Sequence, residues 1–134
     1  MLSTSANMDM KQCIDDCLNC YRVCTQTAMN HCLESGGRHV APEHFRLMMN
    51  CADICRTSAD FMMSSSALHA RICAACAEVC DACADSCEQI GDMDECVQAC
   101  RACAQSCQQM AGGQTGMPLS GKSAQTGAGM AGPM

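Results

Sequence analysis

The sequence predicts an all-α fold, an antiparallel up-down-up-down four-helix bundle whose core is lined with cysteine. Two observations lead to this prediction. Most of the 16 cysteines recur in steps of three or four residues, which is the spacing of one helix face, whereas a β-strand requires steps of two. Segments rich in glycine, proline or serine interrupt this pattern at three points, and connections this short make consecutive helices antiparallel.

The first expected helix ends at the Gly-Gly pair of residues 36–37, because glycine readily adopts the conformation that terminates helices. Its inward face includes Met10 before the cysteines and His31 after them. Cys32 follows Cys24 by eight residues instead of seven, so we expect Cys32 at the margin of the core. The cysteines of this helix are Cys13, Cys17, Cys20, Cys24 and Cys32.

The other three helices follow from similar signals. Pro42 suits the first turn of the second helix, where a missing N–H costs nothing. Residues 64–66 are serines that separate the second helix from the third, with Ser66 as the expected N-cap. Gly91 ends the third helix, and the acidic residues of 92–95 suit the first turn of the fourth. The remaining inward cysteines are Cys51 and Cys55 in the second helix, Cys73, Cys76, Cys80, Cys83 and Cys87 in the third, and Cys96, Cys100, Cys103 and Cys107 in the fourth.

The composition shows that hydrocarbon packing alone does not organise this interior. Leucine, isoleucine, valine, phenylalanine and tyrosine supply about 13% of the chain, too little for a conventional core. We expect residues 1–110 to form the bundle. Seven of the ten glycines lie between Gly112 and Gly132, so residues 111–134 are expected to be a disordered, Gly-rich tail.

Charge and terminal sequence narrow the class of protein. The net charge of −6 and the scattered lysines and arginines argue against a nucleic-acid partner. The first residues lack the basic and apolar regions of a secretory signal, and no apolar stretch is long enough to span a membrane. We therefore expect a cytoplasmic protein, where thiols stay reduced and many cysteines indicate metal binding before disulfides.

Nearly every inward position that is not cysteine is methionine or histidine, and both can bind soft metals or pack in a core. In an antiparallel bundle these residues gather at the two ends. One end is expected to hold His31, His44, Met48 and Met93, and the other Met10, Met62, His69 and Met110.

Geometry and charge both favour Cu(I) as the metal. Residues at positions i and i+4 hold their Cβ atoms about 5–6 Å apart, so two thiolates there suit a soft ion that accepts two or three sulfurs, whereas Zn(II) needs four converging ligands. Each Cu(I) replaces one thiol proton and leaves the core nearly neutral, while Zn(II) would leave uncompensated negative charge buried among the thiolates. An iron–sulfur electron carrier and a metallothionein-like zinc buffer remain as alternatives.

The repeated C-x3-C pairs resemble the cysteine-rich four-helix-bundle copper storage proteins. The resemblance covers roughly residues 8–110 and includes the stretches 50–61 and 73–80 together with Asp92-Met93-Asp94-Glu95-Cys96. The seven pairs are Cys13/Cys17, Cys20/Cys24, Cys51/Cys55, Cys76/Cys80, Cys83/Cys87, Cys96/Cys100 and Cys103/Cys107.

This resemblance implies a non-enzymatic store of many Cu(I) ions in a cytosolic homotetramer, which sequesters copper, protects other proteins and supplies acceptors. Copper chaperones or efflux components are the partners such a store would use. The resemblance places the copper mouth at His31, His44 and Met48, with Met62 and Met110 as the alternative. Ser58 occupies an inward position where a further cysteine would extend the pattern.

Overall fold

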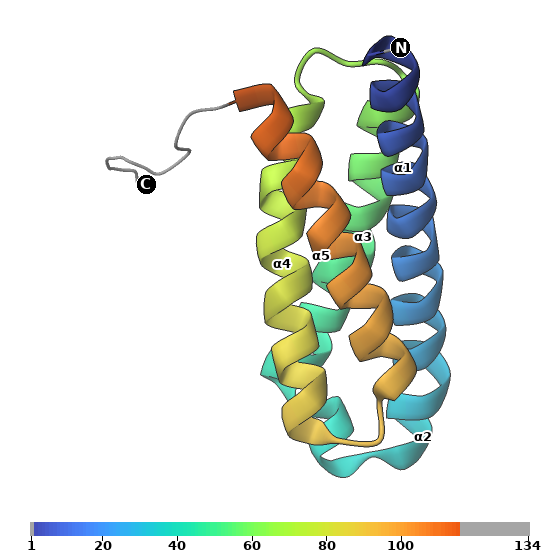
Figure 1. Ribbon diagram of the computed structural model, residues 1–134. Coiled ribbons are helices and arrows are strands. Elements are labelled where there is room, and N and C mark those ends of the chain that lie inside the picture. Colours follow the sequence, from blue (N-terminus) through green and yellow to red (C-terminus); the bar gives the residue numbers. More distant parts are fainter. Residues whose placement is uncertain (1, 116–134) are drawn as a thin grey trace, which may run out of the picture.

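The computed structural model describes residues 2–115, and it describes the side chains of residues 9–112. Four long helical rods form an antiparallel bundle, which confirms the predicted fold (Figure 1). The described elements are α1 (Leu2–Gln26), η1 (Thr27–Cys32), α2 (Leu33–Ser35), η2 (Gly37–Val40), α3 (Pro42–Met63), α4 (His69–Ile90) and α5 (Asp94–Thr115).

The four rods pack as a ring in cross-section. α1 packs against α3 and α5, and α4 packs against the same two helices. The short connections therefore place sequence neighbours side by side, as the up-down-up-down arrangement requires (Figure 1). None of the helices in the described part of the chain is long and apolar enough to cross a membrane.

Helix boundaries agree with most of the expected signals. Pro42 lies in the first turn of α3, and Gly36 and Gly91 end their helices with φ angles of +68° and +86°. Ser66 does not directly precede a helix: α4 begins at His69, and the Ser66 hydroxyl accepts a hydrogen bond from the Leu68 N–H at 3.1 Å in the preceding turn.

The first rod is a single helical run whose C-terminal part changes its winding. Residues Thr27–Cys32 form a π-helix, in which each turn holds more residues than an α-helical turn. This wider turn absorbs the extra residue between Cys24 and Cys32 and brings the Cys32 thiol back to the inner face, where it is fully buried. The expectation that Cys32 lies at the margin of the core was therefore wrong.

Small side chains fill the space between the rods. Apart from the cysteines, the buried residues are mostly alanines, which allow the helix backbones to approach closely. α5 extends to Thr115, five residues beyond the expected end of the bundle, and residues 116–134 of the expected tail lie outside the described part of the chain.

Candidate metal centre

All 16 cysteine side chains are buried in the bundle, and 15 of them form one continuous column of sulfur, beside which the Cys32 thiol lies next to His44. Every cysteine is free, and none is more than 1% exposed. Neighbouring Sγ atoms from different helices lie as close as 3.4 Å for Cys55 and Cys80 and 3.5 Å for Cys24 and Cys96. The periodicity of the sequence had placed these side chains on the inner faces, and the structure shows that they also meet across the helices.

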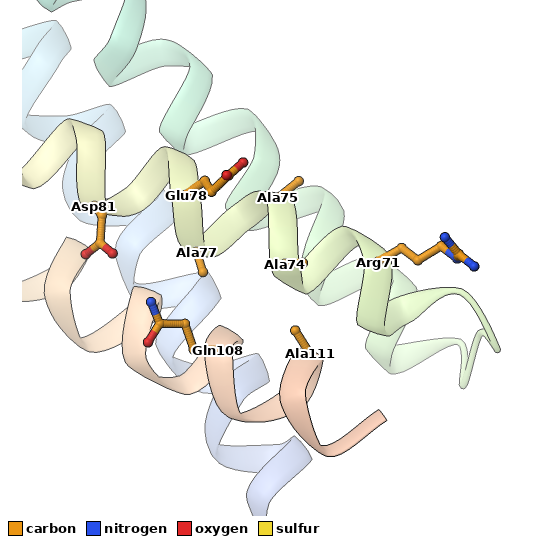
Figure 2. Close-up of a pocket in the computed structure, with 8 residues that line it drawn as sticks. All are labelled: Arg71, Ala74, Ala75, Ala77, Glu78, Asp81, Gln108 and Ala111. Atoms are coloured by element: carbon orange, nitrogen blue, oxygen red, sulfur yellow. The ribbon is translucent and has the colours of Figure 1, made fainter. Parts of the chain in front are cut away.

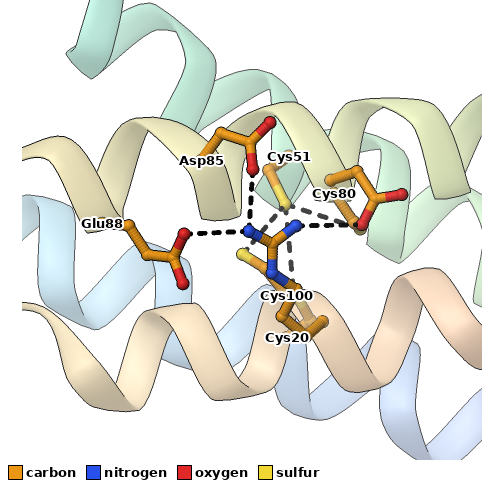
Figure 3. Close-up of polar contacts among 8 residues, drawn as sticks. Cys20, Cys51, Cys80, Asp85, Glu88 and Cys100 are labelled. Atoms are coloured by element: carbon orange, nitrogen blue, oxygen red, sulfur yellow. Dashed lines mark hydrogen bonds and ion pairs between the residues drawn. The ribbon is translucent and has the colours of Figure 1, made fainter.

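Cys51 illustrates how one thiol contacts several helices (Figure 3). Its Sγ lies 3.7 Å from Cys20 on α1, 3.7 Å from Cys80 on α4 and 3.8 Å from Cys100 on α5. Outside the sulfur column in the same region, the Arg101 guanidinium donates to Asp85 and Glu88 at 2.7 and 3.1 Å. These carboxylates link α4 to α5 at the surface and remain separate from the thiols.

The thiols form overlapping groups whose sulfur atoms lie within 4.8 Å of one another and that could hold metal ions. Four groups contain four thiols each, and one contains three. Because members are shared between groups, an ion bound in one group has bridging sulfurs in the next. The groups are Cys17/Cys76/Cys103/Cys107, Cys20/Cys24/Cys51/Cys100, Cys20/Cys55/Cys80/Cys103, Cys24/Cys83/Cys96/Cys100 and Cys13/Cys73/Cys107.

The electrostatics of the column favour a monovalent ion. Among the described residues, His44 and Ser58 are the only buried polar side chains besides the thiols, so no lysine or arginine compensates negative charge in the core. Burial raises the pKa of Cys32 to about 11, and the nearby Cys96 and Cys83 reinforce this shift. Exchange of each proton for one monovalent cation keeps the column neutral, whereas divalent ions on the same thiolates leave net negative charge.

Met48 completes a three-sulfur site at the end of the column near the α4–α5 connection. Its Sδ lies 3.5 Å from the Cys87 Sγ and 3.7 Å from the Cys96 Sγ, and the two thiols are 3.7 Å apart. The point equidistant from three such atoms is about 2.1 Å from each, close to the ~2.3 Å of a zinc–thiolate bond. A soft, three-coordinate ion therefore fits between these sulfurs with little rearrangement.

His44 lies beside this end of the column and is oriented by a serine. Its Nε2 is 4.0 Å from the Cys32 Sγ, and its Nδ1 is 2.8 Å from the Ser86 Oγ. Burial lowers the pKa of His44, so the ring is neutral at pH 7. With the Nδ1 proton donated to Ser86, the Nε2 lone pair faces the thiol, which is the arrangement of a nitrogen ligand next to a sulfur ligand.

His31 occupies the same end of the bundle but lies outside the thiol column. Its ring packs edge-on against that of His39, with centroids 4.9 Å apart, and its Nε2 lies 3.7 Å from an Asp92 carboxylate oxygen. Met93, which is buried, lines the same small cavity as His31. The predicted gathering of His31, His44, Met48 and Met93 at one end is thus confirmed, and two of them, His44 and Met48, contact thiols.

The opposite end of the column is built differently. Cys13, Cys73 and Cys107 form its three-thiol group, and the Ser58 Oγ lies 3.3 Å from the Cys73 Sγ. His69 contacts the backbone, because its Nδ1 donates to the Ser66 carbonyl oxygen at 2.9 Å.

The methionines of that end have different environments. Met62 is fully buried, and Met10 and Met110 are partly buried against the core.

Two residues near the His44 end of the column carry no signal in the sequence. His39 follows the Gly-Gly pair, where no helical period relates it to the cysteines, and Ser86 lies one position from a cysteine, outside the period of three and four residues. Only the packing of α3 against α4 shows that Ser86 meets His44.

One surface cavity is unrelated to the thiols. It has a volume of about 510 Å³ and lies between α4 and α5 (Figure 2). Alanines 74, 75, 77 and 111 line it together with Arg71 and Glu78, and no cysteine does.

Comparison with known proteins identifies relatives of this chain. Residues 6–112 match the family model described as copper storage protein. Over 64 residues the chain is 36% identical to the uncharacterized cysteine-rich protein YhjQ of Bacillus subtilis, and the match spans 58% of that protein's length.

Solved structures give the same result. The Nmul_A1745 protein of Nitrosospira multiformis is 57% identical, with a TM-score of 0.77 over 78% of this chain and 96% of that one. The Cu(I)-bound copper storage protein BsCsp3 is 33% identical, with a TM-score of 0.72 over 77% and 98% of the two chains. A cytosolic copper storage protein of Streptomyces lividans, solved with five coppers, is 31% identical, with a TM-score of 0.71 over 78% and 92%. The chain belongs to the copper storage protein family.

Proposed function

We propose that this chain stores Cu(I) inside the bundle, with cysteine thiolates of all four rods as ligands and on the order of one ion per cysteine. One observation carries the proposal: 16 thiols are buried, 15 of them in one continuous column, and no cationic side chain is buried with them among the described residues. Many monovalent soft ions fit such a column, and no conversion of the cargo is required. Family membership and the Cu(I)-bound relative support the same function.

An anaerobic Cu(I) titration of the fully reduced protein, in competition with a chromophoric Cu(I) chelator, tests the proposal. We expect the chain to withhold well over ten ions from the chelator, because at least three sulfurs surround most positions in the column. Saturation at four or fewer ions would contradict storage. A zinc buffer would produce that result with divalent ions, and an iron–sulfur protein would show visible absorption and acid-labile sulfide.

We propose His44 and Met48 as the copper ligands that complete the mouth, because both contact thiols. His31 is proposed as a surface ligand that an incoming ion meets first. Titration of His44→Phe and Met48→Leu variants tests these roles. Slower copper uptake at nearly unchanged capacity supports them, and uptake at the wild-type rate would contradict them.

The cellular setting is also a proposal. The relative from Streptomyces lividans is described as cytosolic, which supports a cytosolic location for this chain. We propose a homotetramer, supported by the resemblance and by apolar side chains left exposed on the helices, such as Leu18, Met29 and Met63. Light scattering of the purified chain tests the assembly, and a monomeric mass at micromolar concentration would contradict it. Copper chaperones or efflux components are proposed as exchange partners.

A further inference from the structure

Two cavities at the connection between α4 and α5 reach the end of the sulfur column, whose thiols are themselves buried. A cavity of about 260 Å³ is lined by His31, Asp92, Asp94, Glu95 and Cys96, and we call it the acidic vestibule. A neighbouring cavity of about 210 Å³ is lined by Cys87 together with Glu88 and Asp94. The two cavities share Met93 and Asp94, and each is lined by one of the two cysteines of the three-sulfur site, whose side chains are at most 1% exposed.

The donors change in character from the vestibule to the core. The outer part presents carboxylates and the His31 imidazole, whose Nε2 is shielded from solvent and has no hydrogen-bond partner among the described residues. Nitrogen and oxygen donors of this kind suit Cu(II), whereas the thiols and the Met48 thioether suit Cu(I). Clustered carboxylates also raise the local concentration of a divalent cation. An ion that moves inward therefore passes from donors that favour the oxidised state to donors that favour the reduced state.

The first thiols that such an ion meets are suited to supply electrons. The Cys87 and Cys96 sulfurs are 3.7 Å apart on the two helices that flank a short connection, which makes them the pair suited to form the ~2.05 Å bond of a disulfide. Cys87 belongs to none of the four-thiol groups and Cys96 to one, so oxidation of this pair leaves the other three four-thiol groups intact. The Met48 thioether stays in place next to both sulfurs and can hold the reduced ion.

We propose that the reduced, copper-free chain converts Cu(II) to Cu(I) at this mouth, with Cys87 and Cys96 as the electron donors. Two Cu(II) ions each accept one electron, the two thiols lose their protons and form one disulfide, and two Cu(I) ions and two protons result. The reaction is stoichiometric, and an external thiol that reduces the disulfide restores the mouth. This inference rests on the proposed storage function, since the Cu(I) formed is then retained by the remaining thiols.

The test is an anaerobic stopped-flow reaction of the reduced chain with two equivalents of Cu(II) sulfate. Loss of the Cu(II) electron paramagnetic resonance signal, thiol titration and tandem mass spectrometry provide the readouts. We expect one thiol to be lost for each Cu(II) reduced and a disulfide that joins Cys87 to Cys96. Disulfides spread over the column, or a Cu(II) signal that persists, would overturn the proposal.

Matched variants separate the mouth from thiols in general. Cys96→Ser is expected to slow the reduction by about tenfold or more, because the reacting pair is lost. Cys13→Ser removes one thiol at the far end, so it lowers Cu(I) capacity in the same way but is expected to slow Cu(II) reduction far less than Cys96→Ser does. Equal rates for the two variants would refute the assignment. Circular dichroism confirms that each variant is folded.

The acidic vestibule has its own test. The double variant Asp94→Asn/Glu95→Gln is expected to slow the reduction by about tenfold at low ionic strength, and added salt should reduce the difference. The control Asp53→Asn/Asp60→Asn removes two charges from exposed positions on α3, away from the mouth, and should react like the wild type. Equal effects of the two double variants would refute a role for the vestibule. Cu(I) titration of the same variants shows separately whether storage itself holds.

Discussion

Replacement of Ser58 with cysteine is expected to raise the copper capacity of the chain. Ser58 is fully buried, and its Oγ lies 3.3 Å from the Cys73 Sγ in the one group that contains three thiols instead of four. A sulfur at this position gives the Cys13, Cys73 and Cys107 group a fourth thiol. Since each Cu(I) replaces one proton, we expect about one additional ion per chain.

The same substitution should change the stability of the copper-free bundle only slightly. The buried hydroxyl has a weak thiol partner, and its loss relieves a desolvation cost, while the larger sulfur adds volume to a packed core. These effects oppose each other, so we expect a net change of about 1 kcal/mol or less in the free energy of unfolding. Urea denaturation under reducing conditions measures it.

Native mass spectrometry of the fully loaded proteins measures the capacity. Ser35→Cys is the matched control, because it adds a thiol at an exposed position outside the column and should leave the number of tightly held ions unchanged. The reasoning is refuted if Ser58→Cys is folded and binds the same number of ions as the wild type, or if Ser35→Cys gains an ion as well.

Three further predictions concern the mouth and the core. Burial raises the pKa of Cys32 from 9.0 to about 11, so the protonated thiol stabilises the fold. This contribution to stability is fully present below pH 9 and is lost as the pH rises towards 11. The melting temperature of the copper-free protein should therefore fall over this range, and a constant melting temperature would contradict the prediction. Met48→Leu keeps the volume of the side chain and should lower the free energy of unfolding by less than about 1.5 kcal/mol. At low copper loading, X-ray absorption at the copper edge should show fewer sulfur neighbours in this variant, and unchanged spectra would count against the three-sulfur site. Deletion of Asn30 should convert the π-helix to an α-helix and turn Cys32 away from the column. Cys32 should then react faster with a thiol reagent in the deletion variant than in the wild type. Equal reaction rates would contradict the role of the π-helix in burying Cys32.

The sequence predicts the helices of this protein well because one chemical constraint runs through all of them. Most positions that face the centre of the bundle take cysteine, so the seven-residue period is visible in the cysteines themselves. The period fails only between Cys24 and Cys32, where the extra residue is accommodated by a π-helical turn. Sequence spacing alone cannot distinguish a residue displaced from the face from one that a wider turn returns to it.

Contacts between helices are less accessible to prediction. The antiparallel order places His44 and Met48 at the same end as Cys96, but the rotation of each helix decides which atoms meet. That rotation sets the triangle of Met48, Cys87 and Cys96 and the hydrogen bond from His44 to Ser86. Ser86 in particular carries no signal in the sequence, because serine next to a cysteine is equally suited to a solvated helix face.

The location of copper in the loaded protein tests the central claim most directly. A crystal structure of the chain saturated with Cu(I), with anomalous scattering recorded at the copper edge, shows each ion and its ligands. The account predicts copper along the whole column between thiolates of different helices, with one ion between Met48, Cys87 and Cys96. Copper confined to surface histidines and carboxylates, with an empty sulfur column, would contradict it.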